Sequence, residues 1–126
     1  MRAFILAGAS LLAACQTTQP TVSPRTSDEA HALQTRLAET VKTCWFSGDA
    51  AFAGYIYSPE INADAPRILI APRKEPGGRP VLVIEPKSAT TADVYGPMLA
   101  LPMGARVRAD LARWLKGASD CGGAQG

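Results

Sequence analysis

The chain has 126 residues, a length that allows one domain and excludes a second of ordinary size. Its 13 Lys and Arg residues are nearly balanced by 11 Asp and Glu, and no run of basic residues occurs, which excludes an electrostatic nucleic-acid binder. Hydrophobic residues make up 47%, too large a share for an intrinsically disordered chain.

The amino terminus has the pattern of an export signal. Arg2 supplies a positive charge, and residues 3–14 form an apolar run that ends in small residues. A membrane-spanning helix needs about 20 apolar residues, whereas this shorter run passes directly into the polar residues 16–20. The pattern therefore predicts a signal peptide over residues 1–14 that is removed after export.

The end of this segment, Leu12-Ala13-Ala14-Cys15, resembles the lipobox of bacterial lipoproteins, in which an aliphatic residue and two small residues precede a cysteine. The resemblance implies diacylglyceryl transfer to the Cys15 thiol, cleavage before Cys15, and acylation of the new amino terminus, with palmitate among the expected chains. An ordinary secretory peptide with a cysteine near its cleavage site is the alternative.

Gln16 follows the cysteine at a position where Asp would resemble an inner-membrane retention signal. The resemblance therefore extends to small proteobacterial lipoproteins of the outer membrane that face the periplasm. Such an anchor is stable without a basic membrane-binding surface, because several acyl chains enter the bilayer.

The mature chain divides into a tether, a domain and a tail. Residues 15–26 carry the lipidated cysteine and a polar, Pro-containing flexible tether, residues 27–121 form the periplasmic domain, and residues 122–126 are a flexible tail. With the first of the 3 cysteines lipidated, Cys44 and Cys121 remain. Two cysteines in a small exported domain usually pair. A redox-active pair is the alternative, although no Cys-x-x-Cys motif occurs.

The domain begins with a predicted helix over residues 27–45. Thr26 and Glu29 match a capping box, apolar residues then recur at helical spacing, and Gly48 follows the last of them. The only histidine, His31, falls on the polar face of this helix, where a solvated residue is more common than a ligand.

Short strands and a closing helix follow. Strands are predicted over 52–57, 67–71 and 81–85, with a fourth strand or an extended segment over 92–95 and a Pro- and Gly-rich hairpin loop over 72–80. A helix is predicted over residues 103–116. This order predicts a small two-layer α+β domain with an N-terminal helix, an antiparallel sheet of three to four strands and a C-terminal helix, both helices on one face.

The two clearest strands are apolar on both faces, although a sheet with one solvated face should alternate apolar and polar residues. Leu69, Val81 and Val83 would lie on the face away from the helices. Either residues 88–102 fold over this second face, or a partner covers it. That partner would be an envelope protein or a second copy of the chain.

The hairpin loop is the other candidate for partner contact, because Arg73, Lys74 and Arg79 surround its tip. Such a tip could contact anionic headgroups, lipopolysaccharide or a wall polymer, and a solvated charged loop is the alternative. Tyrosines could line a peptide or glycan groove, or could simply pack on the sheet: Tyr55, Tyr57 and Tyr95.

The sequence shows no pattern that carries catalysis. The lone histidine has no nucleophile motif to serve, no cluster of His, Cys or carboxylates suggests a metal ion, and no phosphate-binding loop precedes a helix, so no enzyme and no cofactor is predicted. Carboxylate pairs such as Glu60 with Asp64 have a spacing that indicates no mechanism. Arg106, Asp110 and Arg113 are spaced as an exposed ion-pair ladder on the last helix.

Residues 41–45 (VKTCW), followed by a β-hairpin and a closing helix, look like the carboxy-terminal domains of TolA and TonB, which bind envelope proteins. The likeness extends over residues 30–118 in element order but over Cys44-Trp45 alone in residues, and Pro76-Gly77-Gly78 replaces the usual Asp-Gly turn. It assigns no binding residues. The sequence predicts a lipid-anchored, non-enzymatic envelope protein with a binding or scaffolding domain; the alternative is a periplasmic inhibitor or small-ligand-binding module.

Overall fold

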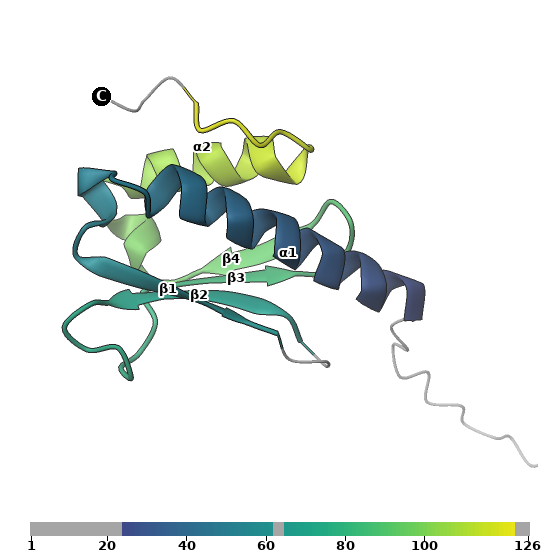
Figure 1. Ribbon diagram of the computed structural model, residues 1–126, viewed down its shortest axis with the longest axis horizontal. Helices are drawn as coiled ribbons and strands as arrows, with labels where there is room; N and C mark the ends of the chain where they lie inside the picture. The colour runs from purple at the N-terminus through teal and green to yellow at the C-terminus, as the bar shows by residue number, and fades with distance from the viewer. Residues whose placement is uncertain (1–23, 62–64, 123–126) are drawn as a thin grey trace, which may run out of the picture.

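The computed structural model describes residues 24–61 and 65–122. The predicted signal peptide, Cys15 and most of the tether lie outside the described residues, as do Asp64 and residues 123–126. The described chain forms an N-terminal helix, a four-stranded antiparallel sheet and a C-terminal helix (Figure 1). The predicted α+β architecture is confirmed.

Helix α1 spans Pro24–Trp45. It begins earlier than the capping-box pattern indicates, because proline is well accommodated in a first helical turn, where its missing N–H would have no partner. The helix buries one apolar stripe against the sheet, as the helical spacing predicts: Ala30, Leu33, Leu37, Val41, Cys44 and Trp45. Gly48 follows with a φ of +104°, a conformation that favours glycine and turns the chain out of the helix direction.

The first strand lies further along the chain than predicted. Residues Ala50–Phe52 form a short 3-10 helix, η1, whose N-cap Asp49 accepts a hydrogen bond from the Ala51 amide at 3.0 Å. Strand β1 then spans Tyr55–Glu60 and continues through Pro59. Proline is tolerated there because β1 is an edge strand, so a missing N–H need not leave a neighbouring strand unpaired.

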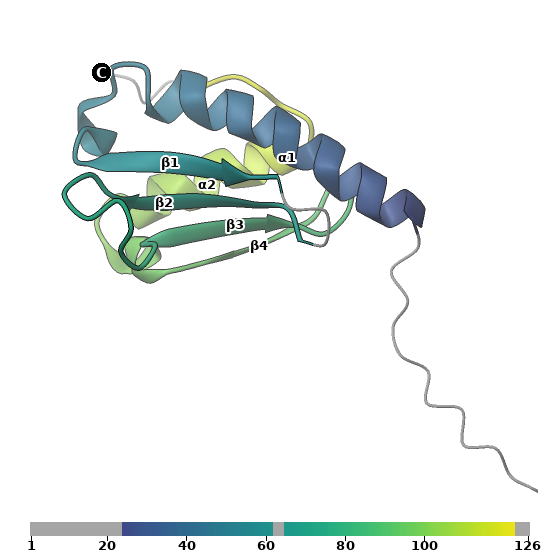
Figure 2. The same cartoon turned by 60° about the horizontal axis from the view of Figure 1, so that its bottom comes forward.

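The remaining strands are β2 (Arg67–Pro72), β3 (Leu82–Pro86) and β4 (Ala92–Tyr95). The sheet order is β1-β2-β3-β4 with every neighbouring pair antiparallel. Both helices lie on the same face of this sheet (Figure 2). The strand residues facing them are fully buried: Ile68, Ile70, Leu82 and Ile84.

Residues 88–102 do not fold over the opposite face of the sheet, which corrects one of the two predicted ways of covering it. They add β4 to the sheet edge and then return to the helix face as a second 3-10 helix, η2, at Pro97–Ala100. Met98 of η2 is fully buried in the main core, and its amide donates to the Val81 carbonyl at 2.9 Å. Apolar contacts therefore draw this segment to the helix layer.

Helix α2 spans Gly104–Leu115 and packs beside the end of α1. A side chain at Gly104 would overlap the Leu99 carbonyl, so the close approach of η2 to α2 requires glycine there. The predicted disulfide is confirmed: Cys44 at the end of α1 is bonded to Cys121 beyond α2, with Cα atoms 5.1 Å apart.

None of the described helices is both long enough and apolar enough to cross a membrane.

Candidate functional site

The antiparallel layout separates the connecting segments into two ends of the domain (Figures 1 and 2). The start of α1 lies at one end with the end of β1, the start of β2 and the β3–β4 connection. We call this the anchor end because Cys15, the predicted anchor residue, precedes α1 in the sequence. The end of α1, η1, residues 73–81 and η2 lie at the other, distal end. The 22 residues of α1 give it a length of about 33 Å.

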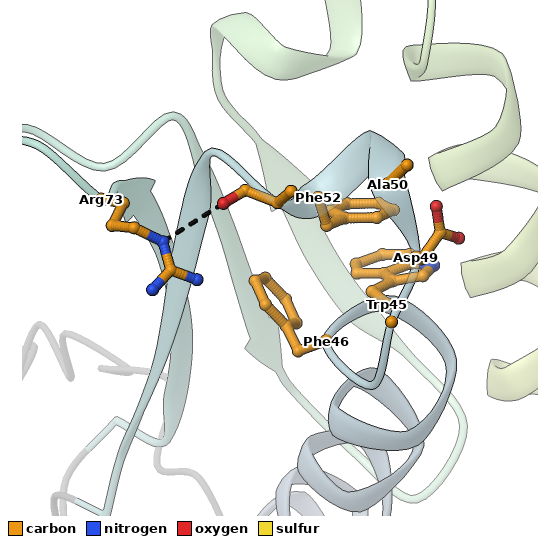
Figure 3. A pocket seen from close by; sticks show the side chains of 8 residues that line it. Trp45, Phe46, Asp49, Ala50, Phe52 and Arg73 are labelled. Carbon is orange, nitrogen blue, oxygen red and sulfur yellow. Dashed lines mark hydrogen bonds between the residues drawn. The ribbon is translucent and has the colours of Figure 1, made fainter.

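A pocket of about 260 Å³ opens at the distal end, between the end of α1, η1 and the residue that follows β2 (Figure 3). The buried rings of Trp45 and Phe52 are stacked 4.8 Å apart and form its inner wall. The half-buried ring of Phe46 packs against Phe52 and Tyr57. The lining is completed by Gly48, Asp49, Ala50, Ala53 and Arg73.

Arg73 lies across the pocket from the stacked rings (Figure 3). Its backbone amide donates to the Gly54 carbonyl at 2.9 Å, and its Nε donates to the Ala53 carbonyl at 3.2 Å. Within the described residues, its two Nη atoms have no hydrogen-bond or ion-pair partner. The pocket therefore has one cationic group that is held in place yet still has donors for a ligand.

The other charged group of the pocket, Asp49, is already paired. It accepts a hydrogen bond from Nη2 of Arg106, whose guanidinium lies over the Phe52 ring, 5.5 Å from the ring centre. This hydrogen bond holds the pKa of Asp49 below its ordinary value and outweighs the opposing effect of burial. The Asp49–Arg106 pair thereby fastens η1 to α2.

Behind the pocket lies a buried acidic residue that sequence reasoning placed on the surface. Asp110 is 3% exposed and accepts a hydrogen bond from Nε1 of Trp45 at 2.8 Å. Its carboxylate also lies 3.0 Å from Nη2 of Arg113 and 3.6 Å from Nε of Arg106. The predicted exposed ladder is wrong, because Asp110 lies on the same side of α2 as the apolar stripe and α1 covers that side.

The Asp49–Arg106 pair predicts a specific loss of stability in acid. Because the folded-state pKa of Asp49 lies below its ordinary value of 3.8, its contribution is complete above that pH and is lost as the pH falls through the folded value. We expect Asp49→Asn to be less stable than wild type at neutral pH, with the difference shrinking in acid. Urea unfolding between about pH 6 and pH 2.5 measures this.

Asp93→Asn is the control. Asp93 is exposed, and its ion pair with the exposed Lys87 is long, at 3.8 Å, so it should contribute little to stability. The Asp49 interpretation is contradicted if wild type and Asp49→Asn lose stability in parallel over the whole range.

The structure places the predicted partner-contact residues in two separate regions. Leu69 and Val83 lie on the sheet face away from the helices, where Val83 is 7% exposed and Leu69 is half-buried. Val81, predicted for the same face, precedes β3 and packs against the main core instead. The loop after β2 curls beneath this face (Figure 1). It bounds a second hollow of about 270 Å³. That hollow is lined by Ile56, Ser58, Glu60, Leu69, Ala71, Pro76, Gly77, Gly78 and Pro80. Arg73 belongs to the distal pocket, while Lys74 and Arg79 are exposed on the loop.

The three tyrosines do not line a common groove. Tyr55 and Tyr57 pack against the main core, whereas Tyr95 lies on the opposite face, where it pairs in register with Val83 and its hydroxyl donates to Glu85 at 3.1 Å. Of the two alternatives predicted for the tyrosines, packing on the sheet rather than lining a groove applies to Tyr55 and Tyr57.

Among residues 24–61 and 65–122, no group of three or more His, Cys, Asp and Glu is arranged to hold a metal ion. His31 lies in α1 with its Nδ1 2.8 Å from the Ser27 carbonyl oxygen. Glu60, one member of a sequence-level carboxylate pair, forms an ion pair with Arg67 at 2.6 Å.

The distal pocket itself was not predicted. Its lining comes from the end of α1, the η1 segment and the start of the loop after β2, which are adjacent only in the folded chain. Comparison with protein-family models, curated proteins and solved structures finds no match to this chain.

Proposed function

We propose that this chain is a lipid-anchored protein of the cell envelope, held in the outer membrane through Cys15, whose periplasmic domain is a non-enzymatic binding or scaffolding module. The observation that carries the proposal is the separation of the two ends. The lipobox-like segment leads into the start of α1, whereas the pocket and the basic loop lie at the other end of that helix. A partner would therefore meet the domain on the side away from the bilayer.

The distribution of charge supports this orientation. The end of α1, the loop after β2 and the start of α2 carry an excess of positive charge. Besides the Asp49–Arg106 pair, they hold one acid, Glu75, and five basic residues: Lys42, Arg73, Lys74, Arg79 and Arg108. At the start of α1 and the strand ends beside it, the acids Asp28, Glu29, Glu60, Glu85 and Asp93 outnumber Arg25, Arg67 and Lys87. A basic surface attracts anionic partners, and an acidic surface is repelled by anionic headgroups.

This arrangement disfavours membrane contact by the basic hairpin loop. Because α1 is about 33 Å long, a domain tethered at its anchor end presents the loop well beyond the headgroup region. The loop thus serves a partner in the periplasm or the cell wall better than it serves the membrane that carries the anchor.

A periplasmic inhibitor or small-ligand-binding module is the second candidate function. The distal pocket favours it, because a small-molecule site is usually concave, with apolar walls and a few polar groups. Arg73 gives this pocket a cation that has no acidic partner among the described residues. The two functions differ in the size of the partner, and covalent capture in cells separates them.

The test is photocrosslinking in intact cells, with a photoreactive amino acid at Lys74 on the loop, at Leu69 on the outer face of the sheet, or at Glu39 as a control. All three positions fall in the described chain, and Glu39 is exposed on α1 away from both candidate surfaces. We expect a discrete protein adduct from Lys74 and none from Glu39. An adduct at twice the chain's own mass from Leu69 would indicate a homodimer.

Cys15→Ser is the matched test of the anchor. We expect the variant to leave the membrane fraction and to lose the crosslinked partner. Unchanged processing and membrane fractionation would contradict the lipoprotein assignment, and a strictly monomeric protein without any adduct would favour the small-ligand alternative.

A further inference from the structure

We propose that the distal pocket binds a free carboxylate attached to a single apolar group, the chemistry of the carboxyl-terminal residue of a peptide or protein. The proposal deepens the proposed function by naming the chemistry of its partner, and it rests on that function for the partner's location in the envelope.

Arg73 is the group that would bind the carboxylate. Its backbone amide donates to the Gly54 carbonyl and its Nε to the Ala53 carbonyl, so one edge of this exposed guanidinium is oriented before a ligand arrives. Its two unpartnered Nη atoms form the end of a planar fork, which matches the two oxygens of a carboxylate. Fixing the donor in advance reduces the entropy lost on binding.

The size of the pocket limits the rest of the ligand to one group. A cavity of roughly 150 Å³ is enough to hold benzene, so about 260 Å³ has room for one aromatic or branched side chain beside the carboxylate. The apolar surfaces available to that side chain are the half-buried ring of Phe46 and the methyl groups of Ala50 and Ala53. A second residue of the ligand would have to remain outside.

The charges around the pocket favour a monoanion over a phosphate dianion. Arg73 is the one pocket cation without an acidic partner among the described residues, and a dianion would need more donors than one guanidinium end supplies. Asp49 is paired with Arg106 and its carboxylate points away from Arg73 (Figure 3), so this ion pair supplies no further donor for a second negative charge. Lys74 and Arg79 add attraction at longer range, which raises the rate of encounter.

The walls of the pocket are held rigidly from behind. The disulfide fixes the end of α1 at Cys44, the indole of Trp45 is bonded to buried Asp110, and the Asp49–Arg106 pair holds η1. The pocket is therefore formed without a ligand, as expected for a binding site and unlike a gap between mobile loops.

The test uses the full-length chain purified in a non-ionic detergent. The probes are two fluorescently labelled peptides, Gly-Ser-Gly-Ser-Gly-Phe with a free carboxyl terminus and the same peptide as its carboxyl-terminal amide, compared by fluorescence anisotropy. The peptides differ in the charge of one group. We expect the amide to bind at least about tenfold more weakly, the usual effect of losing a hydrogen-bonded charge pair.

Arg73→Gln should weaken binding of the acid peptide by about tenfold and leave the amide unaffected. Arg79→Gln is the matched control, because it removes an equal charge from the same loop but does not line the pocket, and it should change affinity less than about threefold at physiological salt.

The proposal is overturned if the two peptides bind equally, if Arg73→Gln and Arg79→Gln weaken binding to the same extent, or if inorganic phosphate competes as well as the acid peptide. These results concern the pocket alone. If the peptide tests fail but Lys74 crosslinks to a protein in cells, the proposed function still stands. The Cys15→Ser variant tests the anchor separately.

Discussion

Replacement of both Cys44 and Cys121 by serine is expected to lower the free energy of unfolding by 2–5 kcal/mol, the usual range for removal of a disulfide from a small exported domain. The bond spans 77 positions of the chain, for which the chain-entropy model gives an upper figure of about 4.5 kcal/mol. A domain of this size has a total stability of about 5–15 kcal/mol, so the loss would be severe.

The effect should be concentrated at the joint between α1 and the segment after α2. That segment is otherwise held by a few polar contacts: Arg36 donates to the Ala118 carbonyl at 3.4 Å, and the Trp114 indole donates to the Asp120 carbonyl at 2.8 Å. Urea unfolding of the double variant against wild type measures the loss, and reduction of the wild-type bond should reproduce it.

Cys15→Ser is the control for replacing a cysteine outside the disulfide, since it should leave the unfolding midpoint of the domain unchanged. The pairing itself is contradicted if Cys44 and Cys121 of the native protein both react with a thiol reagent before reduction.

Asp110→Ala is expected to lower the free energy of unfolding by about 3–5 kcal/mol, the usual result of removing one member of a buried ion pair. The carboxylate is almost completely buried, lies between two arginines and accepts the hydrogen bond from Trp45. Without it, the buried indole N–H loses its acceptor, and Arg106 and Arg113 keep only Asp49 and Asp120 as acidic partners.

Two further variants separate the effect of the buried charge from the effects of the hydrogen bond and of an exposed ion pair. Asp110→Asn keeps an oxygen for the Trp45 indole but removes the charge, so it should fall between wild type and Asp110→Ala. Asp120→Ala removes an exposed carboxylate that contacts the same Arg113 at 3.5 Å, and should change stability by less than about 1 kcal/mol. Equal effects of Asp110→Ala and Asp120→Ala in urea unfolding would contradict the buried network.

The local patterns of the sequence were sufficient for the architecture. Helical spacing in α1 and α2, β-branched runs in β2 and β3, and the Pro-Gly-rich loop between them each act over a few residues, so their element types could be read without tertiary information. The disulfide was predicted by counting cysteines in a chain expected to be exported. The less accurate boundaries, at the start of α1 and of β1, are places where proline and a 3-10 turn shift the ends of elements.

Tertiary packing decided the environment of each charged residue. Asp110 shares the spacing of a surface ladder with Arg106 and Arg113, and nothing within α2 distinguishes it from an exposed residue. It is buried because the end of α1 brings the Trp45 indole against it, a contact between residues 65 positions apart. A sequence pattern on one helix cannot show what a second helix covers.

The same reason explains the candidate site. The proposed export and lipid anchoring rest on a short linear pattern ending at Cys15, so the sequence by itself was enough to predict them. The pocket, by contrast, forms only where the end of α1, η1 and Arg73 meet in the folded chain. The hydrogen bond from Arg73 Nε to the Ala53 carbonyl orients its guanidinium there. The sequence by itself was enough to predict the helices and strands, the disulfide and the proposed anchor. Only the fold decided that Arg73 has no acidic partner among the described residues and that Asp110 is buried, because burial and pairing depend on neighbours that are distant in the chain.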